Sequence, residues 1–172
     1  MYAILMQRRE NMLHNHNIPP IYNEQSRVLI LGTFPSVQSR ECIFYYSHGQ
    51  NRFWPLMARL LGEAVPETVE GKTELLLRNG IALWDVIESC EIEQSSDASI
   101  RNVTPNDIRP ILESAPIERI VANGKWAEKL YNKHIYPITG REIIPLPSTS
   151  PANAACSLDR LAEAWKIIMT ND

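Results

Sequence analysis

The chain has 172 residues, 44% of them hydrophobic, and a formal net charge of −3. This size allows one substantial core, so we expect a single domain. The negative charge argues against a protein that coats nucleic acid without selectivity, although a few well-placed cations can still contact phosphates. No apolar run approaches the roughly 20 residues that span a bilayer. The apolar run at residues 2–6 is too short for a signal peptide, which favours a cytoplasmic protein.

Residues 1–26 show little hydrophobic periodicity, and we expect them to form an arm or a short helix leading into a domain over residues 27–172. His14 and His16 lie in this arm with no further ligands nearby, so a solvated segment is favoured over a metal site. The three cysteines lack the Cys-x-x-Cys spacing of zinc and iron–sulfur sites, which favours reduced thiols. The sequence therefore predicts no metal and no cofactor.

From residue 27 onward, strand-like runs alternate with helix-like runs. Strands are expected at 27–31, 81–84, 118–122 and 143–147, and helices near 52–61, 69–78, 104–114, 125–132 and 157–169. This alternation predicts a parallel sheet with helices on both faces. We therefore expect an α/β fold of three αβα layers around a central, mostly parallel, four-stranded sheet.

A polar and aromatic segment follows the first strand. The strand passes into Gly32–Ser36, and the run Tyr45–Trp54 comes soon after it, with two tyrosines, an asparagine, an arginine and two further rings. Ligands of open α/β sheets bind at the carboxyl ends of the strands. Rings for stacking, an amide and an arginine suit an everted nucleobase and its phosphates.

Three motifs, in this order, resemble those of the uracil-DNA glycosylase superfamily, most closely its mismatch-specific and hypoxanthine-DNA glycosylase branches. Gly-Thr-Phe-Pro-Ser at 32–36 stands where the superfamily has Gly-x-Asn/Asp-Pro-Gly/Tyr. Asn-Arg-Phe-Trp at 51–54 resembles the run that follows in the mismatch-specific branch. Pro-Ser-Thr-Ser-Pro-Ala-Asn at 147–153 takes the place of the second motif, His/Asn-Pro-Ser-x-x-Ser. The resemblance covers residues 27–170, nearly the whole chain.

The resemblance implies an unusual catalytic residue. Most of the superfamily has a catalytic Asn or Asp where this chain has Phe34, and a phenyl ring cannot orient water. The hypoxanthine-DNA glycosylase branch likewise lacks that residue, and the asparagine of its Asn-x-Phe-Trp run is credited with catalysis, so Asn51 inherits the role. An amide carbonyl can orient water beneath the anomeric carbon of an oxocarbenium-like state. Alternatively Asn51 caps the next helix, and the two roles can coexist.

The remaining site residues are also implied by the resemblance. Asp85 ends a strand where uracil-specific relatives have a base-reading asparagine. When ionised, it accepts the N1–H of hypoxanthine and repels the N1 lone pair of adenine. The alternative for Asp85 is a loop cap or a surface charge. Phe34 and a tyrosine, Tyr45 or Tyr46, are candidates for stacking on the base. The expected DNA contacts are Ser36, Arg52, Ser148, Thr149, Ser150 and Asn153, against the ordinary view that such Ser/Pro-rich segments are turns.

Together these features predict a monomeric, monofunctional DNA glycosylase of base-excision repair. Its expected substrate is double-stranded DNA with deaminated bases, and it would hydrolyse the N-glycosidic bond of flipped hypoxanthine (deoxyinosine) to leave an abasic site. Specificity for uracil, xanthine or mismatches is an alternative, and so is a non-catalytic lesion-binding domain, because Phe34 replaces the usual catalytic residue. A nucleoside hydrolase is a further alternative, but the chain lacks the Gly-rich motifs that hold the phosphates of a free nucleotide.

Overall fold

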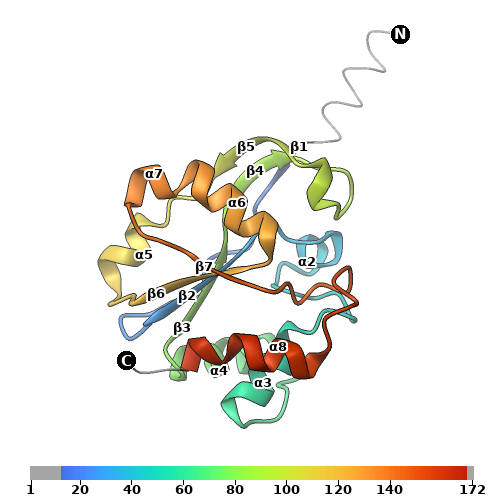
Figure 1. Cartoon of the computed structure of the whole chain (residues 1–172), viewed down its shortest axis with the longest axis vertical. Coiled ribbons are helices and arrows are strands. Elements are labelled where there is room, and N and C mark those ends of the chain that lie inside the picture. The colour runs from blue at the N-terminus through green and yellow to red at the C-terminus, as the bar shows by residue number, and fades with distance from the viewer. Residues whose placement is uncertain (1–12, 170–172) are drawn as a thin grey trace, which may run out of the picture.

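A central parallel sheet organises the chain in the computed structural model, which describes residues 13–169 (Figure 1). Four strands, in the order β3-β2-β6-β7, pair in parallel throughout. They are β2 (Val28–Gly32), β3 (Ile81–Asp85), β6 (Arg119–Asn123) and β7 (Ile144–Leu146). Each strand end lies within one residue of its predicted position. The predicted α/β fold with a four-stranded parallel sheet is confirmed.

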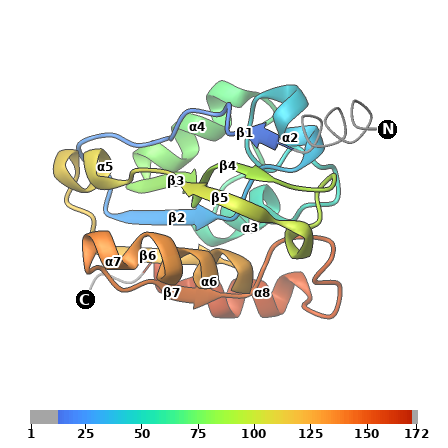
Figure 2. The same ribbon diagram turned by 90° about the horizontal axis from the view of Figure 1, so that it is seen from above.

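Helices cover both faces of this sheet and create two cores (Figures 1 and 2). One face carries α3 (Phe53–Leu61), α4 (Val69–Arg78), α8 (Leu158–Trp165) and η2 (Lys166–Met169), and the other carries α5 (Arg109–Ser114), α6 (Lys125–His134) and α7 (Tyr136–Thr139). Neighbouring residues of β2 alternate between the cores, because Ile30 belongs to the first and Leu31 to the second. Strands buried on both faces read as continuous apolar runs, which makes them recognisable in the sequence.

The helices begin and end where local chemistry favours it. The hydroxyl of Thr68 accepts the Gly71 N–H at 3.0 Å and caps α4, and Ser157 accepts the Arg160 N–H at 3.2 Å and caps α8. Gly62 ends α3 in the left-handed conformation that glycine adopts without strain. Among residues 13–169, no helix has the length and apolar character to cross a membrane.

A second sheet, antiparallel and three-stranded, is not predicted by the sequence pattern. It has the order β1-β4-β5 and consists of β1 (Leu13–Asn15), β4 (Ile87–Glu91) and β5 (Arg101–Pro105). Only Ile87 and Cys90 of β4 are buried, so its sequence Ile-Glu-Ser-Cys-Glu reads as a polar stretch. The predicted arm or short helix at 1–26 is therefore corrected for its described part, which contains a strand; residues 1–12 lie outside the described residues.

The helix predicted over 104–114 is wrong at its start. Residues 101–105 form β5, and the helix begins at Arg109. Asn106 provides the reason, because its buried Nδ2 donates to the carbonyls of Asp85 at 2.9 Å and Ile87 at 3.1 Å and ties this segment to the end of β3. The short helix α2 (Val37–Cys42), capped by the hydroxyl of Ser36, is also not predicted.

Candidate functional site

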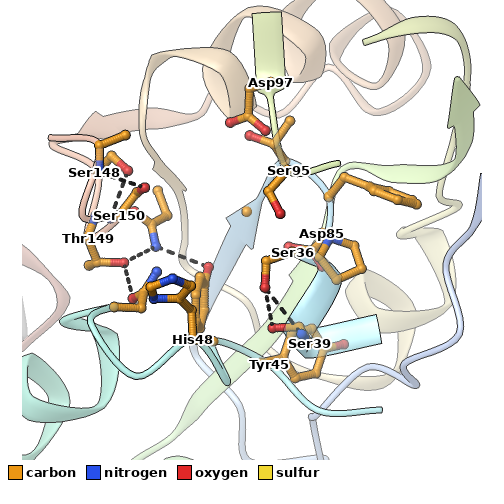
Figure 3. Close-up of a pocket in the computed structure, with 18 of the residues that line it drawn as sticks. Ser36, Ser39, Tyr45, His48, Asp85, Ser95, Asp97, Ser148, Thr149 and Ser150 are labelled. Carbon is orange, nitrogen blue, oxygen red and sulfur yellow. Dashed lines mark hydrogen bonds between the residues drawn. The ribbon is translucent and has the colours of Figure 1, made fainter. Parts of the chain in front are cut away.

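A pocket of about 360 Å³ opens at the carboxyl ends of the parallel strands (Figure 3). β2, β3 and β6 end in it with Gly32, Asp85 and Asn123. Segments that follow β2, precede α3, link β4 to β5 and follow β7 complete the wall. Its further lining residues include Thr33, Phe34, Ser36, Tyr45, Tyr46, His48, Asn51, Ser95, Asp97, Ser148, Thr149 and Ser150.

A continuous chain of hydrogen bonds forms one side of the pocket. Asn123 Nδ2 donates to the Tyr46 hydroxyl and to Thr149 Oγ1, each at 3.0 Å. Asn123 Oδ1 accepts the Thr149 N–H at 3.0 Å, and the Thr149 hydroxyl donates to Asn51 Oδ1 at 2.9 Å. Asn51 Oδ1 also accepts the Phe53 N–H at 2.9 Å. The backbone N–H groups of Thr149 and Phe53 therefore fix the orientation of both amides, because each must meet an oxygen.

Asn51 lies in this pocket immediately before α3. The N-cap position of α3 is Arg52, without a side-chain cap, so the alternative role of Asn51 as the helix cap is not what the structure shows. Asn51 lies one residue earlier and accepts the Phe53 N–H beside the start of the helix. The carbonyl expected to orient water already has two protein donors, the second being Thr149. None of the described residues accepts a hydrogen bond from its Nδ2. The amide can therefore offer Nδ2–H₂ to a ligand.

Asp85 is 4% exposed, which rules out the surface-charge alternative. Its Oδ2 lies 2.7 Å from His16 Nε2, and the His16 side chain is 3% exposed. The expectation that His14 and His16 form a solvated segment is therefore wrong for His16. Asp85 Oδ1 lies above Gly32, where an added Cβ would come within 2.4 Å of Oδ1 and 2.8 Å of the Tyr46 hydroxyl. A side chain at position 32 would collide with both groups.

Asp97 brings a second carboxyl group to the pocket from η1 (Asp97–Ser99). Desolvation raises its pKa to about 6, the negative charge of Asp85 acts in the same direction, and a hydrogen bond with Thr33 opposes the shift. This carboxyl group therefore changes its charge near neutral pH. Perturbed carboxyl groups in a cleft are characteristic of functional sites.

The three rings expected to bind the base all line the pocket. Phe34 is 8% exposed, and Tyr45 is 2% exposed with its hydroxyl donating to the Pro19 carbonyl at 2.8 Å. Tyr46 stacks on Phe53 with ring centroids 4.2 Å apart. Burial raises the pKa of both tyrosines, so their hydroxyls stay neutral. Tyr45 is largely committed to the protein interior, and stacking on a base stays a prediction for all three.

The residues expected to contact DNA differ in accessibility. Ser36, Ser148 and Ser150 are partly exposed around the pocket. Asn153 is also partly exposed, and its Nδ2 donates to the Ser148 carbonyl at 3.0 Å. Thr149 is fully buried, with both its hydroxyl and its N–H in the hydrogen-bonded chain. Thr149 therefore holds the neighbouring amides and has no surface for a phosphate.

Arg52 also has an internal role. Its guanidinium donates to the carbonyls of Ser150 at 3.1 Å and Asn153 at 3.0 Å, and to that of Cys156. Its own N–H donates to the Thr149 carbonyl at 3.1 Å. These bonds hold the loop after β7 against the start of α3, so the guanidinium shapes this loop instead of facing a phosphate.

Three residues of the site are absent from the sequence-based set: Asn123, Asp97 and His16. Asn123 ends a parallel strand, so the rule that selects Asp85 also selects it. Asp97 and His16 carry no such signal, because they lie in polar segments whose antiparallel sheet is not predicted. Among residues 13–169, no group of three His, Cys, Asp or Glu side chains is placed to hold a metal ion.

Comparisons with known proteins agree with this geometry. The Uracil DNA glycosylase superfamily profile matches residues 19–169. A Methanosarcina acetivorans protein named hypoxanthine DNA glycosylase is 33% identical over 152 residues, covering 87% of this chain and 94% of the relative. A Methanosarcina barkeri protein of the same name is 31% identical over 159 residues, covering 90% of this chain and 99% of the relative.

A solved structure gives the same result at the level of the fold. The solution NMR structure of a Methanosarcina acetivorans protein, described as a candidate uracil DNA glycosylase, matches with a TM-score of 0.76 and 30% sequence identity. The match covers 92% of this chain and 100% of that one. The family profile spans every strand of the central sheet and every segment that lines the pocket. This chain belongs to the uracil DNA glycosylase superfamily.

Proposed function

We propose that this chain is a monomeric, monofunctional DNA glycosylase that removes hypoxanthine from deoxyinosine in double-stranded DNA and leaves an abasic site. Membership of the superfamily and the two relatives named hypoxanthine DNA glycosylase support this proposal. The observation that carries it is one pocket that holds both the amide of Asn51 and the buried carboxylate of Asp85.

Asp85 provides the selectivity for the base. Its oxygens accept hydrogen bonds and donate none when the group is ionised. Hypoxanthine offers an N1–H donor on its Watson–Crick edge, whereas adenine offers a lone pair there. A buried carboxylate that meets a lone pair loses a hydrogen bond and gains repulsion, so adenine is rejected.

Asn51 acts on the sugar side of the base. As the glycosidic bond breaks, positive charge grows on the sugar, and groups arranged for this charge lower the barrier. Because Asn51 Oδ1 is occupied, we assign the holding of the attacking water to Nδ2–H₂. The water oxygen bonds to C1′, the bond from C1′ to N9 breaks, and one proton of the water ends on the released base. The carboxyl groups of Asp85 and Asp97 favour the positive sugar.

Partly exposed polar groups at the rim of the pocket would receive the DNA backbone. Ser36, Ser148, Ser150 and Asn153 are the candidates, because hydroxyls and amides commonly position phosphates. Phe34 and Tyr46 are the rings we propose to contact the everted base. Thr149 and Arg52 would support this surface from behind through their internal hydrogen bonds.

Lesion duplexes test the proposal directly. Labelled duplexes with one deoxyinosine, deoxyuridine or deoxyxanthosine are incubated with excess protein, and abasic sites are then cleaved with alkali. We expect cleavage at deoxyinosine, and a loss of about 100-fold or more in the single-turnover rate for Asn51→Ala, the effect of removing one well-placed donor. Asn132→Ala, at an exposed asparagine on α6, is the matched control and should keep the wild-type rate.

The results of the duplex assay distinguish the proposed function from its alternatives. Wild-type cleavage by Asn51→Ala would remove Asn51 from catalysis. Retention of the deoxyinosine duplex without any base release would make the chain a lesion-binding domain, the alternative that Phe34 in the first motif supports. Faster release of uracil or xanthine would assign one of them as the substrate, since each carries an N–H that Asp85 can accept.

A further inference from the structure

A buried hydrogen bond joins the segment after β1 to the end of β3. His16 Nε2 lies 2.7 Å from Asp85 Oδ2, with side-chain exposures of 3% and 5%. The two residues are 69 positions apart in the sequence. The pairing of β1 with β4, together with the His16 N–H to Glu88 carbonyl bond, brings the ring to this position. The tertiary fold, and not the local sequence, therefore brings this buried polar pair together.

The second ring nitrogen fixes the proton on the first. The backbone N–H of Ile18 donates to His16 Nδ1 at 3.3 Å, so Nδ1 is an acceptor without a hydrogen. The ring proton must then be on Nε2, where it points to Asp85 Oδ2. A doubly protonated ring would direct its Nδ1–H at the Ile18 N–H. Nε2 of His16 is therefore the atom that donates to Asp85.

Aromatic rings hold the imidazole in place. Phe34, Tyr45 and Trp84 surround it with centroid distances of 6.1, 6.3 and 6.2 Å. Two of these rings also line the base pocket. The position of His16 is therefore coupled to the wall that a base would contact.

Because of the hydrogen bond to His16, the two carboxylate oxygens of Asp85 have different surroundings. Oδ2 is committed to His16, and Oδ1 lies above Gly32 beside the Tyr46 hydroxyl, next to the pocket. The titratable groups that face Asp85 are His16 behind it, Tyr45 and Tyr46 from the segment before α3, and Asp97 from η1. Both tyrosines are neutral, and Asp97 contributes negative charge when ionised. The donor from His16 therefore gives the buried Oδ2 of Asp85 its hydrogen-bond partner and leaves Oδ1 for the pocket.

We propose that His16 is a positioning residue that holds Asp85 as an oriented acceptor for the N–H of a 6-oxopurine and so sets the specificity of the site. This inference rests on the proposed function. Without this donor, the buried Oδ2 of Asp85 has no hydrogen-bond partner and the carboxyl group is no longer fixed, so Oδ1 loses its alignment with the N1–H of the base.

Two polar substitutions at His16 distinguish the effect of the hydrogen-bond donor from the effect of losing the ring. In His16→Gln, the amide Nε2 can reach the place of the imidazole Nε2, so the bond to Asp85 is kept. In His16→Asn, the shorter amide reaches only the place of Nδ1. Single-turnover release from deoxyinosine duplexes is measured at neutral pH, with His14→Gln as the neighbouring control on β1 and thermal unfolding to verify folding.

The expected result is a loss of at least tenfold in the single-turnover rate for His16→Asn at neutral pH. The single-turnover rate of His16→Gln should stay within about threefold of wild type, because this variant keeps most of the hydrogen bond to Asp85. In a double-mutant cycle, adding His16→Asn to Asp85→Asn should cause no further loss, because both changes remove the same interaction.

Equal rates for His16→Asn and wild type would overturn the inference. So would additive losses in the cycle, because they would place His16 in a general structural role. In either case wild-type release of hypoxanthine leaves the proposed function standing. Absence of release by the wild-type protein would remove the proposed function, and this inference with it.

Discussion

The two sides of the pocket are held by different kinds of hydrogen bond. The amide wall (Asn51, Asn123, Thr149 and Tyr46) consists of uncharged groups oriented by backbone N–H donors. The carboxyl wall (Asp85, Asp97 and His16) consists of titratable groups that act on one another. Backbone anchoring makes the first wall independent of pH over the range in which the protein is folded. The charge of the second wall depends on burial and on its neighbours, so changes of pH should act mainly there.

After the loss expected for Asn51→Ala, the next largest expected effect is on the carboxyl wall. Asp85→Asn replaces a charged acceptor by a neutral amide, and we expect the rate on deoxyinosine to fall about 10- to 100-fold, the cost of one charged hydrogen bond. Because the amide also carries a donor, the preference among deoxyinosine, deoxyuridine and deoxyxanthosine should change more than it does in Asn51→Ala. The ratios of single-turnover rates measure this. Unchanged ratios would remove Asp85 from base recognition.

Thr149→Val probes the amide wall. The valine keeps the volume but leaves Asn51 Oδ1 without one donor and Asn123 Nδ2 without one acceptor. We expect a loss of about 1–3 kcal/mol in the free energy of unfolding, the cost of unsatisfied buried polar groups. Urea denaturation measures this loss. Thr73→Val is the control, because the Thr73 hydroxyl bonds to the Val69 carbonyl on an exposed helix. Equal losses in the two variants would contradict a special role for the wall.

The smallest effect concerns Asp97 and pH. Its pKa is about 6 in the folded protein and 3.8 ordinarily, so the folded state binds its proton more tightly than the unfolded state. Stability from this group is therefore full below pH 4 and declines as pH rises through 6. The decline should be about 1–3 kcal/mol, and Asp97→Asn should remove it. Denaturation at pH 4.5 and pH 8 tests this; a wild-type loss that persists in the variant would exclude Asp97 as its source.

The central sheet was predictable because its strands are buried on both faces. Val28–Gly32 and Ile81–Asp85 read as uninterrupted apolar runs bounded by polar residues, which is typical of parallel strands. The second sheet was not predictable for the opposite reason. In Ile87–Glu91 only Ile87 and Cys90 are buried, and Arg101–Pro105 is mostly exposed, so neither has an apolar run.

The same contrast applies to the site. Asn51 and Asp85 lie in or beside motifs on the central sheet, and the sequence places both in the pocket. His16 depends on strand pairing with β4, which no local pattern in residues 13–17 reveals. The internal roles of Arg52 and Thr149 depend on each other across the fold. Sequence motifs identify residues that lie together in the pocket. The hydrogen-bond partners of these residues depend on tertiary contacts, which the motifs do not show.

The bonds of Arg52 have a consequence for biosynthesis. Asn51 is oriented by Thr149, which is 98 positions later in the chain, and the loop around Thr149 is held by Arg52 across similar separations. A ribosome therefore completes β2, α3, β3 and β6 before it makes the residues that orient the amide. Contacts between such distant residues form late. A nascent chain that ends before residue 149 holds Asn51 without its Thr149 donor, so we expect no base release from unfinished protein.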